Sequence, residues 1–334
     1  MNTRAASDGR GGFALPSVLF VVAMVTLVFL VAIEALTSLA AETRGARRAV
    51  LFQAQAQSLE ADIAFAAATR PLGPAAVMRS SEPGAGALFA LDGRPYAAGT
   101  DLTVATQDEA GLINVDDLPV AAMPRLFAAM GVPGDAQTMM TDRLADYLSA
   151  GDLRRPNGAK ADDYRHAGLP APPDGPLRRR DQLLGVMGWS DEVGRSAWRS
   201  FADNVTADPT SITANINTAT PAMLAVVYGL NPAQIQAALA RRAQAPFTAL
   251  SDMGRTVGLG LPGDAELVYT QPSGRFAVKI EDRAAGLAHR SRILLSPADD
   301  GRPFWVAEPA LSSLTAAEKA TPPTHVLAFP DPAA

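Results

Sequence analysis

The stretch FALPSVLFVVAMVTLVFLVAI, Phe13–Ile33, decides how the rest of the chain is organised. It contains no charged residue, Arg10 precedes it by three positions, and Glu34 follows it at once. At about 1.5 Å per residue, a helix of this length covers about 30 Å, which is the thickness of the hydrocarbon core of a bilayer. No later stretch is as long and as apolar. The stretch therefore predicts a helix that lies in a membrane during at least part of the protein's life.

Three interpretations fit the boundaries of this stretch. A secretory signal peptide would be cut near Ser38–Ala40, but its apolar centre is usually only about 7–15 residues long. A plain single-span anchor is the second interpretation. The third is a prepilin-type leader, in which a short polar segment ending in Gly12 is removed just before Phe13. The apolar helix then stays as the N-terminus of the mature protein.

Composition excludes several function classes. The 334 residues suffice for two domains, or for one domain with a large insertion. A net charge of −5 gives no electrostatic reason to expect nucleic acid as a partner. The absence of cysteine excludes disulfides, thiol nucleophiles and thiolate metal sites. The three histidines, His166, His289 and His325, are far apart and form no zinc motif.

The helical pattern continues beyond Ile33 as far as Thr69. No helix breaker stronger than Gly45 occurs before Pro71. Apolar residues then recur at spacings of three and four, which places them on one helix face: Ala49, Phe52, Ala56, Leu59, Ile63 and Ala66. We expect one helix from about Phe13 to Thr69, apolar all round at first and amphipathic afterwards. A membrane anchor and a separate stalk helix, with a bend near Gly45, are the alternative.

The remaining segments predict an α+β fold, in which a long helix packs on an antiparallel sheet that carries a large helical insertion. Short strand patterns occur at 88–91, 102–106 and 112–115, with Asp92-Gly93 as a hairpin turn. Short helical segments separated by Gly, Pro or Asn fill residues 116–266. Strand patterns return at 275–281, 290–295 and 304–306, and residues 311–334 have the composition of a disordered tail.

One part of the helical block, Asn215–Met253, predicts a helix-hairpin-helix unit. Thr218 or Thr220 is a suitable N-cap before Pro221, and Pro232 begins the next helix after a Gly-Leu-Asn hairpin. Such units often bind the DNA backbone. The chain is acidic and Arg241-Arg242 is the only basic pair near this hairpin, so we expect this unit to pack against protein.

A second segment, Asp142–Tyr164, contains four aspartates that bracket a Pro-Asn-Gly loop: Asp146, Asp152, Asp162 and Asp163. Clustered carboxylates on a loop are able to surround calcium, which takes about six to eight oxygen ligands. In the alternative interpretation the loop is solvated, and its aspartates cap helices and pair with Arg154, Arg155 and Lys160. The loop contains no EF-hand pattern.

No pattern in the sequence predicts catalysis. The chain has no G-x-S-x-G, S-x-x-K, P-loop or dinucleotide-binding motif. Adjacent carboxylates such as Asp116-Asp117 fit turns and helix caps as well as acid–base chemistry, and Trp189 and Trp198 suit a helical core. We therefore expect a protein that is not an enzyme.

These features together resemble a known family. Gly-Gly before Phe13, the apolar helix, GLINVDDL at Gly111–Leu118, DYL with the ADDY loop, and NINTATPAML at Asn215–Leu224 are similar to general secretion pathway protein K. This family comprises minor pseudopilins of the type II secretion system. The resemblance covers roughly residues 12–306, and it implies a pilin-like fold with a large helical domain inserted in the sheet.

The resemblance also implies a processing route, a location and partners. A prepilin peptidase would cut between Gly12 and Phe13 and methylate the new N-terminal amine. The protein would span the inner membrane once, in contact with its lipid, with the C-terminal body in the periplasm. It would cap the pseudopilus with the minor pseudopilins I and J and take part in protein export across the outer membrane.

Two positions depart from the patterns that the resemblance implies. Most pilin-like proteins carry Glu at the fifth mature position, where it pairs with a neighbour's N-terminal amine, whereas Ser17 stands here. An unpaired carboxylate in a bilayer is costly, so its absence suits a subunit at the tip. Relatives bind calcium at the loop that matches 146–164, but Ser149 and Lys160 occupy positions that are commonly acidic. Both interpretations of this loop, a calcium site and a solvated loop, therefore remain open.

The expected organisation has six parts: a leader at 1–12, a transmembrane helix half at 13–36, pilin-like helix and strands at 37–115, the inserted helical domain at 116–266, C-terminal strands at 267–310 and a tail at 311–334. A membrane-tethered periplasmic binding module that recruits a soluble partner or an exported substrate is the alternative function. A periplasmic enzyme released by signal peptidase is a third.

Overall fold

The computed structural model describes residues 14–82, 84–210, 214–261, 268–296, 301–320, 322–323 and 325–327. The chain divides into two compact units, residues 1–55 and residues 56–334. The predicted cleavage site, Gly12 and Phe13, lies outside the described residues.

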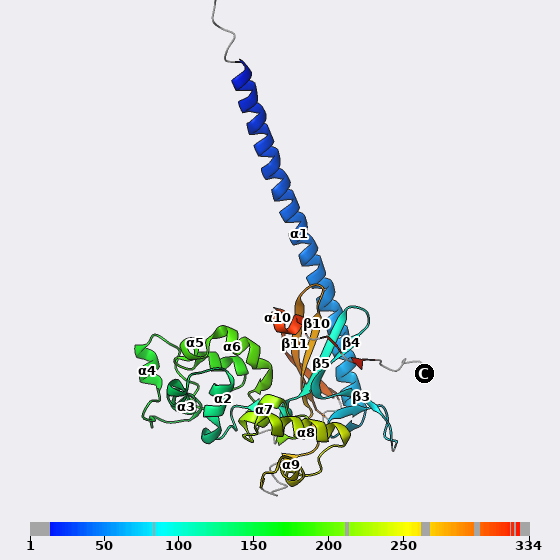
Figure 1. Ribbon diagram of the computed structural model, residues 1–334, viewed down its shortest axis with the longest axis vertical. Helices are drawn as coiled ribbons and strands as arrows, with labels where there is room; N and C mark the ends of the chain where they lie inside the picture. Colours follow the sequence, from blue (N-terminus) through cyan, green and yellow to red (C-terminus); the bar gives the residue numbers. More distant parts are fainter. Residues whose placement is uncertain are drawn as a thin grey trace, which may run out of the picture. The chain divides into compact units, whose positions relative to one another are not determined.

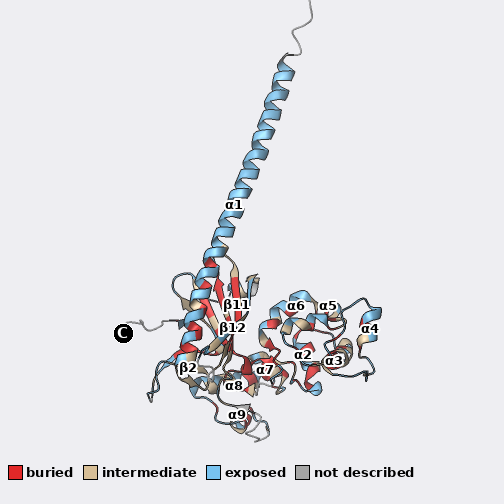
Figure 2. Cartoon of the chain, turned by 180° about the vertical axis from the view of Figure 1, so that it is seen from behind, coloured by how far each residue is buried: buried red, intermediate tan, exposed pale blue. Residues whose placement is uncertain are grey.

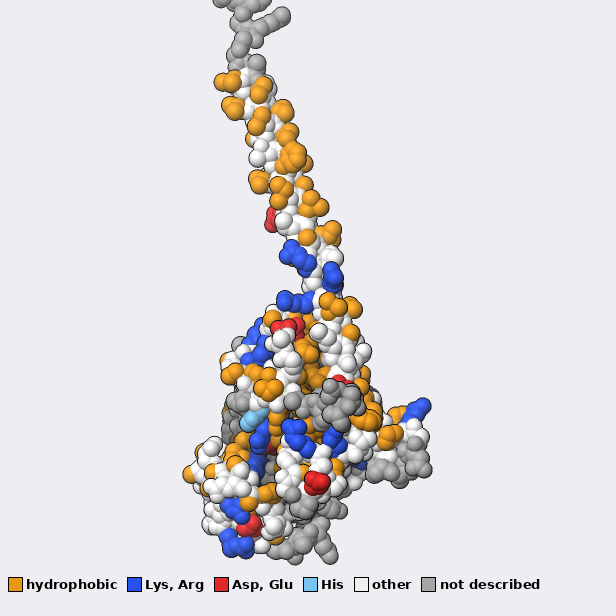
Figure 3. All heavy atoms as spheres, turned by 90° about the vertical axis from the view of Figure 1, so that its right-hand side faces the viewer, with side chains coloured by type: hydrophobic (Ala, Val, Ile, Leu, Met, Phe, Trp, Pro, Cys, Tyr) orange, Lys and Arg blue, Asp and Glu red, His pale blue; other side chains and the backbone are white. Residues whose placement is uncertain are grey.

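Helix α1, Ala14–Thr69, is continuous, and it passes Gly45 without a break. This confirms the single long helix. The side chains of residues 15–48 are exposed, as Figure 2 shows in pale blue. Hydrophobic side chains cover the first part of this helix, and blue basic side chains follow (Figure 3). Among the described residues, α1 is the one helix whose length and apolar composition suffice to cross a membrane.

The last turns of α1, from Ala56 onward, belong to the second unit. Ala56, Ile63 and Ala66 of the predicted stripe are buried there. The buried carboxylate of Glu60 lies 3.0 Å from His289 Nε2 and also accepts a hydrogen bond from Ser291. These contacts attach the end of the helix to a strand of the sheet.

Six described strands form the main sheet, in the order β12-β11-β10-β5-β4-β13. All neighbours are antiparallel except β13 and β4. Figure 1 shows β4, β5, β10 and β11 side by side. The strands are β4 Asp92–Ala98, β5 Leu102–Asp108, β10 Arg275–Asp282, β11 Leu287–Leu295, β12 Phe304–Ser313 and β13 His325–Val326.

Strand β10 has the predicted alternation. Phe276, Val278 and Ile280 are at most 2% exposed, whereas Arg275 and Lys279 on the other face are partly exposed. Successive side chains of a strand point to opposite faces, so this pattern buries one face of the sheet. In the register between β10 and β5, Ile280 is opposite Val104.

The predicted hairpin at Asp92-Gly93 is wrong. Strand β3, Ala87–Ala90, pairs with β2, Ala76–Met78, which in turn pairs with β1, Leu72–Gly73, in a separate small sheet. Strand β4 begins at Asp92 and pairs with β5. The Asp-Gly sequence therefore marks the point where the chain passes from one sheet to the other.

The helical block packs around a continuous apolar core. The ring of Trp189 meets Phe127 and Trp198 edge to face, with centroids 6.0 and 5.4 Å apart, so these tryptophans lie in the core as predicted. The helices are α2 Met123–Ala129, α3 Gly134–Leu148, α4 Ala161–His166, α5 Trp189–Glu192, α6 Gly194–Phe201, α7 Pro221–Val226, α8 Pro232–Gln244 and α9 Leu250–Val257.

The chain between β5 and β10 also contains two short pairs of parallel strands. Strand β6, Ile113–Asn114, pairs with β7, Val205–Thr206, and β8, Ala214–Asn215, pairs with β9, Val268–Tyr269. The strand expected at 112–115 is thus shorter and lies outside the main sheet.

The helical block is inserted between two neighbouring strands, since β5 ends at Asp108 and its partner β10 begins at Arg275. The chain therefore leaves the sheet and returns to it at one place. This confirms the α+β, pilin-like architecture with an inserted helical domain.

The end of the chain differs from the predicted tail. Strand β12 runs to Ser313, Leu314 is buried, and helix α10, Ala316–Ala320, follows. Glu318 of α10 pairs with Arg290 of β11. The composition of residues 311–320 did not reveal these contacts.

Candidate functional site

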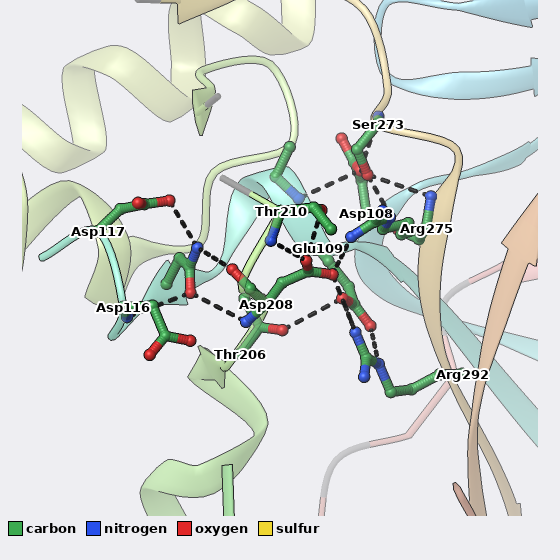
Figure 4. Close-up of polar contacts among 12 residues, drawn as sticks. Asp108, Glu109, Asp116, Asp117, Thr206, Asp208, Thr210, Ser273, Arg275 and Arg292 are labelled. Carbon is green, nitrogen blue, oxygen red and sulfur yellow. Dashed lines mark hydrogen bonds and ion pairs between the residues drawn. The ribbon is translucent and has the colours of Figure 1, made fainter. Parts of the chain in front are cut away.

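A group of polar side chains, built around buried carboxylates, lies where the helical insertion leaves and rejoins the sheet (Figure 4). We call it the polar junction and define it by nine residues: Asp108, Glu109, Asn114, Asp208, Asn215, Thr218, Ser273, Arg275 and Arg292. They come from β5 and the turn after it, from β6, from the loop after β7, from β8 and the loop after it, and from β10, β11 and the loop before β10.

Asp108, the last residue of β5, is at the centre of the polar junction and is fully buried. Its Oδ1 accepts hydrogen bonds from Ser273 N at 3.1 Å and Ser273 Oγ at 2.6 Å. Its Oδ2 accepts from Asn215 Nδ2 at 3.1 Å and Thr218 Oγ1 at 2.9 Å. Burial raises the pKa of Asp108 above its usual value, against the opposing effect of these donors.

The segment NINTATPAML folds into a turn that presents these donors. Thr218 N donates to Asn215 O at 3.2 Å, and the Asn217 amide bonds both the N–H and the C=O of Phe247. Thr220 caps α7 by accepting from Met223 N at 3.1 Å. A Cβ on Gly111 would lie 2.2 Å from Thr218 O, so only glycine allows the two loops to approach this closely.

Arg292 of β11 forms a bidentate ion pair with Glu109. Its Nε lies 2.5 Å from Oε1 and its Nη2 lies 2.6 Å from Oε2, and Glu109 is 2% exposed. This pair raises the pKa of Arg292. Thr206 Oγ1 donates to the same carboxylate at 3.1 Å. The pair therefore joins the insertion to the sheet by charge-assisted bonds.

Asp208 forms the second ion pair of the junction, with Arg275 of β10. Burial alone would raise the pKa of Asp208, but hydrogen bonds from Thr210 and Arg275 outweigh it, and the pKa is lowered. Asn114 accepts from Asp208 N at 3.2 Å and donates to Asp208 O at 3.2 Å. The Asn of GLINVDDL thus binds the loop that follows β7.

Asp116, next in GLINVDDL, lies at the margin of this network. Its Oδ1 accepts from Leu177 N at 2.7 Å, whereas the buried Oδ2 has no hydrogen-bond partner. Burial, with the nearby charges of Asp117 and Asp208, raises the pKa of Asp116 to about 6.

A cavity of about 480 Å³ adjoins the polar junction. Charged side chains of the sheet and of the insertion line it, among them Glu109, Arg180, Asp203, Lys279, Arg290 and Arg292. Asp203 lies within 4 Å of the cationic groups of Arg180, Lys279 and Arg290, which lowers the pKa of Asp203 although burial opposes this. Since both signs of charge line the cavity, it has no strong preference for a cation or an anion.

The polar junction suits a mechanical role. Its carboxylates face hydroxyl, amide and guanidinium donors, and a satisfied buried network stiffens the structure around it. The hydroxyls of Thr218 and Ser273 donate to the Asp108 carboxylate, and the neighbouring Thr206 hydroxyl donates to Glu109. The arrangement holds the helical insertion against the sheet.

The four aspartates predicted for calcium do not converge on one point. Asp146 is fully buried and paired with Arg155, Asp162 pairs with Arg165, Asp163 pairs with Arg154, and Asp152 is exposed. Among the described residues, no group of three or more His, Asp or Glu side chains is arranged to hold a metal ion. The donor set of this loop therefore does not fit calcium.

The helix-hairpin-helix unit is present, as α7 and α8. Asn231 and Gln234 form a capping box at the start of α8. Arg242 donates to Ala219 O at 2.6 Å, and Arg241 donates to Ala245 O at 2.7 Å and lies over the Phe247 ring. Both arginines thus make contacts within the fold.

Sequence patterns alone do not distinguish most residues of the polar junction. Asp108, Ser273 and Arg292 resemble ordinary turn and surface residues, and their partners lie more than 100 positions away along the chain. The motifs GLINVDDL and NINTATPAML were the only signal. They mark the segments that supply Asn114 of β6, Asn215 of β8 and Thr218.

The long N-terminal helix, the antiparallel sheet and the helical block inserted between neighbouring strands define a pilin-like protein with an inserted helical domain. Residues 100–199 match the family model described as "Type II secretion system (T2SS), protein K". The resemblance to the protein K family is thereby confirmed.

Among solved structures, the chain is similar to one in "The Crystal Structure of the GspK-GspI-GspJ complex from enterotoxigenic Escherichia coli Type 2 Secretion System". The TM-score is 0.52 with 16% sequence identity, over 81% of this chain and 98% of that one. At this identity the similarity concerns the fold. The search of curated proteins found no match.

Proposed function

We propose that this protein is a non-enzymatic minor pseudopilin that caps the tip of the type II secretion pseudopilus and takes part in protein export across the outer membrane. The observation that carries the proposal is the insertion of a helical domain between the neighbouring strands β5 and β10 of a pilin-like sheet. A bulky body at this position suits the end of a filament, where no further subunit has to stack.

The protein is first inserted in the inner membrane, with residues 13–36 of the long helix as its single span and the C-terminal body in the periplasm. A prepilin peptidase removes residues 1–12 and methylates the amine of Phe13. The exposed apolar side chains of residues 15–33 support this role, because lipid and then neighbouring helices of a filament would cover them. Ser17 supports a position without a neighbour above it.

The proposed partners are the minor pseudopilins I and J. The fold similarity to a chain of the GspK-GspI-GspJ complex supports this assignment. The polar junction supports it as well, since a stiff connection between sheet and insertion would present one surface to both partners. Co-purification of the full chain with candidate I and J proteins from the same organism should give a stable ternary complex.

The mature N-terminus tests the processing step. Mass spectrometry of the membrane-extracted protein should find a methylated phenylalanine at Phe13, and Gly12→Val should block cleavage. Gly11→Ala is the matched control, since it leaves the residue before the cut unchanged. A mature protein that starts near Ala41, or normal maturation of Gly12→Val, would contradict the proposal.

The cavity beside the polar junction favours a second candidate function, a membrane-tethered periplasmic module that binds a soluble partner or an exported substrate. Its volume of about 480 Å³ is in the range of ligand sites. Capture of an exported protein by the full chain, without formation of a complex with I and J, would favour this function over the first.

A further inference from the structure

Lys160, in the loop between α3 and α4, has a buried ammonium group. The residue is 7% exposed. Its Nζ donates to Asp146 O at 2.8 Å, to Ser149 O at 2.7 Å and to Ser149 Oγ at 3.2 Å. An ammonium has three donors, so these three oxygens satisfy it.

A second cation, the guanidinium of Arg155, binds an acidic residue in the last turn of α3. The carboxylate of Asp146 accepts from Arg155 Nη1 at 2.6 Å and from Arg155 N at 3.0 Å. Asp146 is fully buried. A Cβ on Gly158 would lie 1.8 Å from Asp146 Oδ2, so the loop closes tightly over the carboxylate.

The two cations use the oxygens that a divalent metal ion would need. Oxygen ligands from carboxylates, carbonyls and water are what calcium takes. Here the carbonyls of Asp146 and Ser149 bind the Lys160 ammonium, and the Asp146 carboxylate binds Arg155. A divalent ion would have to displace both, and it would then leave a buried ammonium without partners, which is costly.

We propose that the Lys160 ammonium is the built-in cation of this loop, and that it closes residues 149–160 onto the end of α3 without a divalent metal. The loop thus has the form of a cation site, with carbonyl, hydroxyl and carboxylate oxygens turned inward, but the cation is part of the chain. The closure is independent of calcium, whatever its concentration in the compartment.

Amine labelling tests the proposal on the unmodified protein. The chain has three lysines, Lys160, Lys279 and Lys319, and Lys319 is exposed. Full-length protein in detergent is treated with an acetylating reagent, and each lysine is quantified by mass spectrometry. Because a buried amine reacts only after local opening, Lys160 should react at least about tenfold more slowly than Lys319. Its rate should be the same with millimolar calcium and with a chelator.

Two labelling results would overturn the proposal. If Lys160 reacted as fast as Lys319, its ammonium would be in solvent rather than in the loop. If a chelator exposed Lys160, or if calcium did so by expelling its side chain, a divalent metal would control the closure. No substitution is needed for this measurement, so a variant that does not fold leaves the test intact.

Thermal unfolding provides a second, independent test. Lys160→Met keeps most of the side-chain length but leaves three oxygens without their donor, and we expect its Tm to fall by about 4–10 °C. Lys319→Met is the control and should shift Tm by less than about 2 °C. Calcium or a chelator should leave the Tm of the unmodified chain unchanged. A lower Tm in chelator, or an unchanged Tm for Lys160→Met, would count against a built-in cation.

Discussion

The carboxylate of Asp108 accepts a hydrogen bond of 3.1 Å from the side chain of Asn215, 107 residues later in the chain. Asp108 ends a strand of the main sheet, and Asn215 begins the NINTATPAML motif of the helical insertion. This contact therefore crosses between the two parts that the pilin-like fold has to keep together.

Replacing Asp108 should weaken the junction strongly. In Asp108→Asn an amide N–H₂ replaces one oxygen that faces donors from Ser273, Asn215 or Thr218. Donors then oppose donors in a buried site, and we expect a loss of about 2–4 kcal/mol in the free energy of unfolding. Chemical denaturation of the full chain in detergent measures it. Asp101→Asn, on an exposed turn, is the control and should change stability by less than about 0.5 kcal/mol.

Gly111→Ala tests the close approach of the two motifs. The added Cβ would lie 2.2 Å from the carbonyl oxygen of Thr218, so one loop has to move. We expect a loss of about 1–3 kcal/mol, as for overpacked cores. In the control, Gly134→Ala, no atom lies within 4 Å of the new Cβ, and stability should stay the same or rise slightly. Equal effects of the two substitutions would mean that the approach is not tight.

The titration of Asp116 should make stability depend on pH. Its pKa is raised to about 6 in the folded state from 3.8 in the unfolded state. Between these values the folded chain keeps a proton that the unfolded chain has lost, so the stabilising contribution is present below about pH 4 and is lost as pH rises through about 6.

Asp116→Asn should remove this dependence, because an amide oxygen still accepts from Leu177 N and no charge has to be buried. Relative to the unmodified protein, the variant should gain about 1–2 kcal/mol between about pH 4 and pH 7.5. Thermal unfolding across this range measures it, and Asp152→Asn at an exposed position is the control. A gain that is the same at every pH would contradict the role of Asp116.

The ion pair between Glu109 and Arg292 should show strong coupling. Arg292→Met leaves a buried carboxylate with Thr206 as its remaining side-chain donor, and we expect a loss of about 3–5 kcal/mol. In the double variant with Glu109→Gln the charge is absent, so the loss should be smaller than for Arg292→Met alone. Arg94→Met, which breaks a more exposed pair with Asp92, should cost less than about 1 kcal/mol. Additive losses would show that the two residues act independently.

The elements that the sequence predicted well depend on local patterns. The length of α1 followed from the lack of any helix breaker stronger than Gly45 between Ile33 and Pro71, and the buried face of β10 followed from strict alternation. The starts of α7 and α8 followed from Thr220, Asn231 and the prolines after them. Each of these signals acts within a few residues, so it can be recognised without knowledge of the fold.

The tertiary structure alone decided which distant groups meet. Asp108 and Ser273 are 165 positions apart, and nothing in either segment distinguishes them from residues of ordinary turns. The aspartates of the 146–163 loop had the composition of a calcium site, but their partners depend on where Lys160, Arg154 and Arg155 point. A carboxylate has the same appearance in a sequence whether it binds a metal, a guanidinium or a backbone amide. Only the folded chain brings the competing cations to it and determines which one it binds.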